Sequence, residues 1–332
     1  MDNSCDEIKG MLSLYEASYL GFQGEKILDE ARAFTTNYLK KYLKQGEIKP
    51  TLKEQVVHSL ELPRHWRVIR FESYWYIDIY ERQGDVNPAL LELAKVDFNL
   101  VQSTHHTNIQ NMSRWWVDLG LAEQLKYTRD RVVEYFFGTI GWLYQPQLSS
   151  FREGLTKVNG LITTIDDTYD LYGSMDELVL FTDAVNRWEL NAPQNLPEYL
   201  KVLISALFKT VEEISHEILN KKGVDISSYL KKGTELKKED IPNAIQCYML
   251  ENGVTKEVAV EHIRGLISES WKKINEECVA QSLFPREFID ACTNTIRLSH
   301  CILQYGDGYN SPDKHETTNQ IMMFLIKPIP LA

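Results

Sequence analysis

The sequence predicts an all-α protein, and three observations support this fold class. Apolar residues recur at steps of three and four in several long segments, which places them on one face of a helix. Prolines fall between these segments, where they can end or begin helices. The sustained alternation of apolar and polar residues that is typical of a half-buried strand is absent, and no Asn-Gly or Asp-Gly pair joins two strand-like runs.

The helical pattern is clearest in residues 24–43, 88–102, 198–219 and 256–277. In the first of these segments we expect an apolar stripe to face the core, formed by Ile27, Leu28, Ala31, Phe34, Tyr38 and Leu39.

The helical pattern breaks near residues 60–65, where LELPRHW separates one helical pattern from the next. We therefore divide the chain into residues 1–62 and residues 63–332. About 60 residues bury too little surface to be stable alone. We interpret the first part as the end of a helical domain that docks on a larger helical bundle.

Composition limits the classes of function. The 332 residues carry a net charge of −11, which argues against binding to nucleic acid. No apolar stretch is long enough to span a bilayer, and the opening MDNSCDEIKG has neither the basic start nor the apolar core of a signal peptide. Five scattered cysteines without a CxxC pattern are typical of a reducing compartment. We expect a cytoplasmic monomer as the chain is written, without a membrane or nucleic-acid partner.

Residues 154–173 are the most informative segment for chemistry. An apolar helical face leads directly into Asp166, Asp167 and Asp170, and Gly173 follows as a candidate C-cap. On an α-helix these carboxylates would be neighbours at steps of three and four, and each like-charged pair costs about 0.2–0.5 kcal/mol. The negative end of the helix dipole adds to that cost. A bound Mg²⁺ would offset it, since Mg²⁺ takes carboxylate oxygens and bridges to phosphates. The alternative is a solvated acidic helix end.

Two arginines precede an aromatic-rich segment. Arg129 and Arg131 flank Asp130, just before VVEYFFGTIGWLY. Arginine is well suited to bind phosphate in a partly dry site, so this pair is a candidate diphosphate site. The alternative is a surface helix start. The aromatic residues that follow either belong to the core or line a pocket whose rings stabilise a cation.

The order of these motifs resembles a plant class I terpene synthase, closest to the monoterpene-forming group. The RDR of residues 129–131 precedes the DDxxD of residues 166–170, KVDFNLVQ and MSRWWVDLGL lie upstream, and YGDGY lies at residues 305–309. MLSLYEASYL and LDEARAFTTNYL resemble the family's N-terminal helical domain. The resemblance implies a class I terpenoid synthase helical bundle that follows the remnant of that N-terminal domain.

The resemblance also implies a reaction. Such enzymes bind a prenyl diphosphate through three Mg²⁺ or Mn²⁺ ions and ionise it to a carbocation. For this chain we expect geranyl diphosphate as substrate and a monoterpene plus diphosphate as products. By resemblance, Asp166, Asp167 and Asp170 bind metal, and Asp166 and Asp170 also contact the substrate through it.

Further roles follow from the same resemblance. Arg129 and Arg131 would attract the diphosphate and keep it from recapturing the cation, with Arg129 in direct contact with the substrate. Asp307 and Tyr309 match a segment that caps the pocket in the family, and we count them with the two arginines as catalytic candidates.

The chain departs from the family pattern at its second metal motif, (N/D)DxxSxxxE. Glu235 alone matches the glutamate of that motif, and we expect helices to be missing around residues 230–235 and the third metal site to be incomplete. The tandem-arginine RRx8W segment is also missing, and full-length monoterpene-type relatives carry a plastid transit peptide. Three alternatives therefore stay open: a catalytically inactive splice or pseudogene relic, an enzyme that forms a sesquiterpene from farnesyl diphosphate, and a helical interaction protein with an acidic face.

Overall fold

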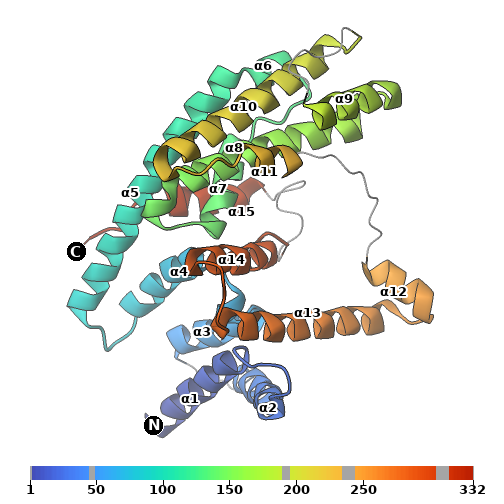
Figure 1. The fold of residues 1–332 in the computed structure, drawn as a ribbon. Coiled ribbons are helices and arrows are strands. Elements are labelled where there is room, and N and C mark those ends of the chain that lie inside the picture. Colours follow the sequence, from blue (N-terminus) through green and yellow to red (C-terminus); the bar gives the residue numbers. More distant parts are fainter. Residues whose placement is uncertain (1, 45–48, 189–194, 234–243, 304–313, 332) are drawn as a thin grey trace. The chain divides into compact units, whose positions relative to one another are not determined.

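The computed structural model describes residues 2–44, 49–188, 195–233, 244–303 and 314–331, and every element within these ranges is helical. The all-α prediction is therefore confirmed. The chain forms two compact units (Figure 1). Unit 1 comprises Met1–Asn99, Asp240–Gln320 and Ile329–Ala332, and unit 2 comprises Leu100–Glu239 and Ile321–Pro328.

Unit 1 combines helices from both ends of the chain. They are α1 (Asp2–Ser18), α2 (Lys26–Tyr42), α3 (Pro50–Glu61), a 3₁₀ turn (Arg64–Trp66), α4 (Ile69–Glu81), the first part of α5 (Pro88–Leu119), α12 (Ala244–Asn252), α13 (Lys256–Val279), α14 (Arg286–Leu303) and α15 (Lys314–Ile321).

The apolar stripe expected on residues 24–43 is partly wrong. The segment does form a helix, α2, but Ile27 and Phe34 are 75% and 58% exposed, while Thr35 and Leu39 are buried. The reason is that α2 packs chiefly against α1, and a single neighbouring helix covers a narrower stripe than a full core does. Leu39 joins a small cluster of buried residues from the first three helices, namely Ile8, Tyr15, Leu52 and Val56.

A second cluster in unit 1 is aromatic. Trp66 stacks on Trp271 of α13 at 5.5 Å between ring centroids, and on His300 of α14 at 5.2 Å. The indole N–H of Trp271 donates to Nε2 of His300 at 3.1 Å. These rings join the 3₁₀ turn near residue 65 to two helices that lie more than 200 residues later in the chain.

Unit 2 is the second helical unit. It contains the rest of α5, α6 (Leu121–Gln124), α7 (Val132–Trp142), a 3₁₀ turn (Pro146–Leu148), α8 (Ser149–Asp167), a π-helical turn (Thr168–Tyr172), α9 (Met175–Arg187), α10 (Glu198–Lys222), α11 (Ser227–Gly233) and a second π-helical turn (Met322–Ile326).

Two buried contacts fix the position of α8 in unit 2. Near its start, the buried guanidinium of Arg152 donates to the carbonyl of Leu143 and, at 2.7 Å, to Oδ1 of Asn108. Farther along, Gly160 leaves room for the indole of Trp116, since a Cβ at residue 160 would lie 3.2 Å from Trp116 Cζ3. Helix α8 thus packs against α7 and α10, and it contacts α5 through Asn108 and Trp116.

Candidate active site

The C-terminal end of α8 presents its aspartates on different faces. Leu161, Ile165 and Asp167 are buried, whereas Asp166 and Asp170 are exposed. Because successive residues of an α-helix are rotated by about 100°, adjacent aspartates cannot point the same way. The motif therefore splits into one inward carboxylate and two outward ones.

A π-turn follows the first two aspartates, which corrects the expectation of continuous α-helical spacing. Residues Thr168–Tyr172 form a π-helical turn, and the N–H of Gly173 donates to the carbonyl of Thr168 at 2.7 Å. Such single π-turns occur frequently at functional sites.

Gly173 ends the turn, although not as the left-handed cap that the sequence suggested. Its backbone is extended, with φ −72° and ψ 140°. A Cβ at this position would lie 2.6 Å from Cδ2 of Leu178 and 3.1 Å from the Thr168 carbonyl oxygen. Glycine is needed here because the chain passes too close to its neighbours for any side chain.

Asp167 forms a bidentate ion pair with Arg129. The guanidinium Nε lies 2.9 Å from one carboxylate oxygen and Nη2 lies 2.6 Å from the other. The Asp167 side chain is only 4% exposed. The hydrogen bonds to Asp167 raise the pKa of Arg129 above its ordinary value. The prediction that Asp167 binds metal stays a prediction, but in this structure both of its oxygens already have a cationic partner.

Asp166 lies in a negative local field. Its pKa is raised, first because neighbouring atoms partly remove the carboxylate from water, and then because of the charges of Asp170 and Asp167. Arg129 opposes this shift. A divalent cation between the outward carboxylates would relieve their repulsion, and oxygen donors are the ligands that Mg²⁺ prefers.

The remaining predicted residues are placed less completely. Arg131 occupies the N-cap of α7, two residues from Arg129. Glu235, Asp307 and Tyr309 lie outside the described residues. Within the described ranges, no group of three or more histidine, cysteine, aspartate or glutamate side chains is arranged to hold a metal ion. A metal site built from the described residues would thus rely on two carboxylates, with water and phosphate oxygens completing the shell.

Sequence reasoning missed a residue that contacts the end of α8, Tyr127. The hydroxyl of Tyr127 lies 2.9 Å from Oγ1 of Thr168, and the Tyr127 ring stacks on Tyr172 at 4.3 Å. The only signal in the sequence was the position of Tyr127, two residues before the RDR motif.

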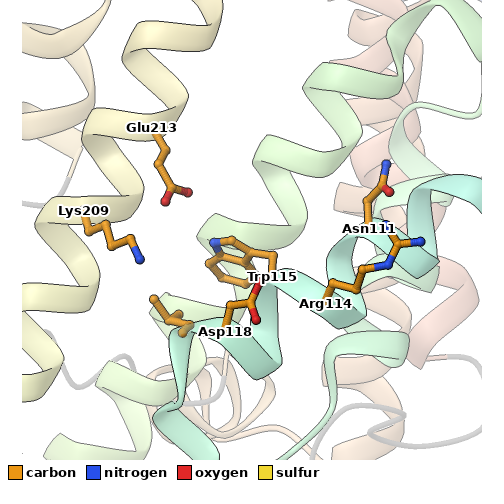
Figure 2. A pocket seen from close by; sticks show the side chains of 7 residues that line it. Asn111, Arg114, Trp115, Asp118, Lys209 and Glu213 are labelled. Atoms are coloured by element: carbon orange, nitrogen blue, oxygen red, sulfur yellow. The ribbon is translucent and has the colours of Figure 1, made fainter.

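Two pockets lined by described residues of unit 2 lie away from the aspartates. One, of about 300 Å³, lies between α5 and α10 and is lined in part by Trp115, Asp118, Lys209 and Glu213 (Figure 2). Another, of about 180 Å³, is lined by residues near the start of α8 and the end of α10. Neither includes Asp166, Asp167 or Asp170.

Comparisons with known proteins identify the family. The chain is 39% identical to alpha-thujene synthase TPS3 of Litsea cubeba over 98% of its own length and 70% of that relative. The profile described as "Terpene synthase family, metal binding domain" matches residues 117–236 and 232–273, and "Terpene synthase, N-terminal domain" matches residues 1–60. The chain belongs to the terpene synthase family. Members of this family are lyases that act on prenyl diphosphates.

Other relatives and solved structures agree with this assignment. The chain is 38% identical to (-)-alpha-terpineol synthase of Vitis vinifera, over 98% of this chain and 69% of that one. Isoprene synthase from grey poplar has a TM-score of 0.89 and 34% identity, covering 100% of this chain and 77% of that one. The same enzyme has also been solved with three Mg²⁺ ions and dimethylallyl-S-thiolodiphosphate. The class I terpenoid fold is therefore confirmed.

The match to the metal-binding profile is divided into two parts. The two matches to the metal-binding profile meet at residues 232–236. The alignment with the Litsea relative runs over 409 positions, whereas this chain has 332 residues. Some residues of that relative therefore lie opposite gaps in this chain. Several relatives are named as chloroplastic. Among the helices of the described ranges, none has the length and apolar character needed to cross a membrane.

Proposed function

We propose that this chain is a metal-dependent terpene synthase that ionises geranyl diphosphate and releases a monoterpene and diphosphate. The observation that carries the proposal is the end of α8, where two outward aspartates flank an arginine–aspartate pair in a chain of this family. Relatives named as alpha-thujene, alpha-terpineol and myrcene synthases support a monoterpene product.

The donor set at the end of α8 fits a hard divalent cation. Asp166 and Asp170 are exposed residues, and the pKa of Asp166 is raised, first by partial removal of its carboxylate from water and then by the charges of Asp170 and Asp167, which a cation would neutralise. When bound, Mg²⁺ or Mn²⁺ acts as a Lewis acid that stabilises the departing diphosphate. The poplar isoprene synthase complex with three Mg²⁺ ions supports this assignment.

The arginines complete the site. Asp167 holds the guanidinium of Arg129 beside the outward aspartates, so we assign Asp167 to orienting Arg129 as well as to the local charge balance. Arg129 and Arg131 then attract the diphosphate. Glu235 as a further metal ligand, and Asp307 and Tyr309 as the pocket cap, are part of the proposal without a described geometry.

A product assay tests the proposal. Purified protein is incubated with geranyl diphosphate and, separately, with farnesyl diphosphate, each with Mg²⁺ or with a chelator, and volatile products are measured in the headspace. We expect Mg²⁺-dependent terpene release from geranyl diphosphate. The variants Asp166→Ala and Asp170→Ala should abolish it, whereas Asp176→Ala, an exposed aspartate of α9, should leave it unchanged.

Each other outcome has a definite meaning. Release from farnesyl diphosphate alone would replace the monoterpene assignment with a sesquiterpene one. If protein that is helical by circular dichroism forms no volatile product from either substrate, the enzymatic proposal is overturned. The alternative is a chain that binds metal and diphosphate without turnover, and it is motivated by the aligned positions of the Litsea relative that have no counterpart here. A cytoplasmic location and a monomeric state remain predictions.

A further inference from the structure

We propose that Tyr127 is a positioning residue that holds the π-turn at the end of α8 and thereby sets the geometry of the Asp166 and Asp170 carboxylates. This inference rests on the proposed function, because it assigns Tyr127 a role in metal binding through those two aspartates. Tyr127 itself touches neither carboxylate in the contacts that we describe.

The contacts of Tyr127 reach both ends of the π-turn. Its hydroxyl lies 2.9 Å from Oγ1 of Thr168, the first residue of the turn. Its ring stacks on Tyr172, the last residue, with centroids 4.3 Å apart and planes 18° apart. One side chain from outside the helix therefore spans the five residues that contain Asp170.

The hydrogen-bond network fixes which hydroxyl donates. The hydroxyl of Thr168 donates to the carbonyl of Thr164 at 2.8 Å, one turn earlier in α8. Its single proton is thus used, and its oxygen must accept from the hydroxyl of Tyr127. A phenylalanine at residue 127 would keep the ring stacking and lose this bond alone.

The far end of the turn is held from a second side. The ring of Tyr199, on α10, meets Tyr172 edge to face at 5.1 Å. The hydroxyl of Tyr199 donates to Glu177 at 3.1 Å, and Glu177 forms the capping box of α9 with Ser174. Because Tyr172 is itself 58% exposed, burial of its ring is a weak constraint, and these ring contacts are what define its place.

The conformation of the turn matters for the aspartates. A π-turn accommodates one more residue than an α-turn, so the residues beyond it are rotated by about 100° relative to an uninterrupted α-helix. Asp166 lies before the π-turn and Asp170 within it. Relaxation of the turn toward α-helical geometry would change the distance between the two carboxylates, and Mg²⁺ demands near-ideal ligand positions.

The test measures binding of Mn²⁺, alone and with inorganic diphosphate, by electron paramagnetic resonance at a temperature where every variant is folded. Tyr127→Phe should raise the Mn²⁺ dissociation constant roughly 5-fold, the factor that corresponds to one hydrogen bond of about 1 kcal/mol. Thr168→Val should weaken binding at least as much, because it also removes the bond to the Thr164 carbonyl, whereas Thr168→Ser should bind as the unchanged protein does. The double variant Tyr127→Phe with Thr168→Val should be no worse than Thr168→Val alone.

The matched control is Thr139→Val, which removes a buried hydroxyl of α7 that is hydrogen-bonded to Thr156. Thr156 lies on α8, about three turns before the π-turn. It should lower stability and leave Mn²⁺ affinity unchanged. Amide hydrogen exchange supplies a metal-free measurement, since Tyr127→Phe should speed exchange of the Gly173 N–H that closes the turn.

The outcomes separate the two proposals. Equal Mn²⁺ affinity in the unchanged protein and in Tyr127→Phe overturns the positioning role, whatever the exchange rate of Gly173. Equal losses in Thr139→Val and Tyr127→Phe also overturn it, because the effect would then be one of general stability. Absence of Mn²⁺ binding by the unchanged protein overturns the proposed metal site first, and the positioning role falls with it.

Discussion

Helices α8 and α13 illustrate two different relations between sequence and packing. Both show a clear helical period, but α8 buries seven of its 19 residues, including Asp167, whereas α13 buries four of its 24. Three of the four lie in the second half of α13, where Trp271 meets the aromatic cluster. In the first half, apolar residues such as Leu266 are left half exposed by the rest of unit 1.

The comparison indicates where the chain has retained its packing partners. Helix α8 carries the aspartates and has α5, α7 and α10 as packing partners. Helix α13 follows the point at residues 232–236 where the family match is discontinuous. Our proposal that this chain lacks helices present in its relatives accounts for an apolar helix face without a cover, because the missing segments would come before α12 and α13 in the chain.

The largest expected difference between the two helices concerns their ion pairs. Arg129→Gln removes the partner of Asp167, a carboxylate that is 4% exposed, and should lower the free energy of unfolding of unit 2 by about 3–5 kcal/mol. Lys272→Gln in α13 removes a partner of Asp29, and although the Lys272 side chain is only 10% exposed, Asp29 is 40% exposed and its carboxylate stays in contact with water, so the expected cost is smaller, about 1 kcal/mol in unit 1. Urea unfolding of both variants measures the difference, and equal costs would contradict it.

A pair of leucines extends the comparison to apolar packing. Leu161→Ala in α8 removes a buried side chain, and we expect a loss of about 2–5 kcal/mol. Leu266→Ala in α13 removes one that is half exposed, and the expected change is within about 0.5 kcal/mol. Urea midpoints followed by circular dichroism give both values. A large loss of stability in Leu266→Ala would mean that the first half of α13 is buried against other residues in solution.

The sequence predicted the helices and the family better than it predicted the site. Helical periodicity and the order of RDR and DDxxD were sufficient for the fold class, because both are local patterns. The buried face of α2 and the bidentate pair of Arg129 with Asp167 depend on which elements become neighbours, and a sequence pattern does not contain that information. The π-turn was missed for a related reason: its contacts with Tyr127 come from a loop some 40 residues earlier.

Two glycines should respond with opposite signs. Gly173→Ala places a Cβ 2.6 Å from Leu178 and should cost about 1–3 kcal/mol of stability. Gly265→Ala lies mid-helix in α13 with no atom within 4 Å of the new Cβ, and should stabilise unit 1 by about 0.5–1 kcal/mol. Thermal unfolding of the two variants and the unchanged protein tests the pair. A gain in stability from Gly173→Ala would show that the turn is looser than the structure describes.

The smallest expected effect is a pH dependence of the stability of unit 1 that comes from two histidines. Burial lowers the pKa of both His65 and His300, and Nε2 of His300 accepts a hydrogen bond from the indole of Trp271, so protonation there would remove the acceptor. The folded state therefore binds these protons less readily than the unfolded state does. The contribution to stability is complete above the ordinary histidine pKa of about 6.5, and it declines as the pH falls from that value toward the folded-state pKa.

Urea unfolding between pH 8 and pH 5.5, followed by tryptophan fluorescence, measures this decline. For each histidine its slope cannot exceed about 1.4 kcal/mol per pH unit, the free-energy equivalent of one proton. His300→Gln removes one of the two titrating groups and should flatten the profile, because glutamine does not take up a proton in this range. His106→Gln changes an exposed histidine of α5 and should leave the profile as it is. A decline of the same slope in both variants would place the titrating group outside the cluster that anchors the second half of α13.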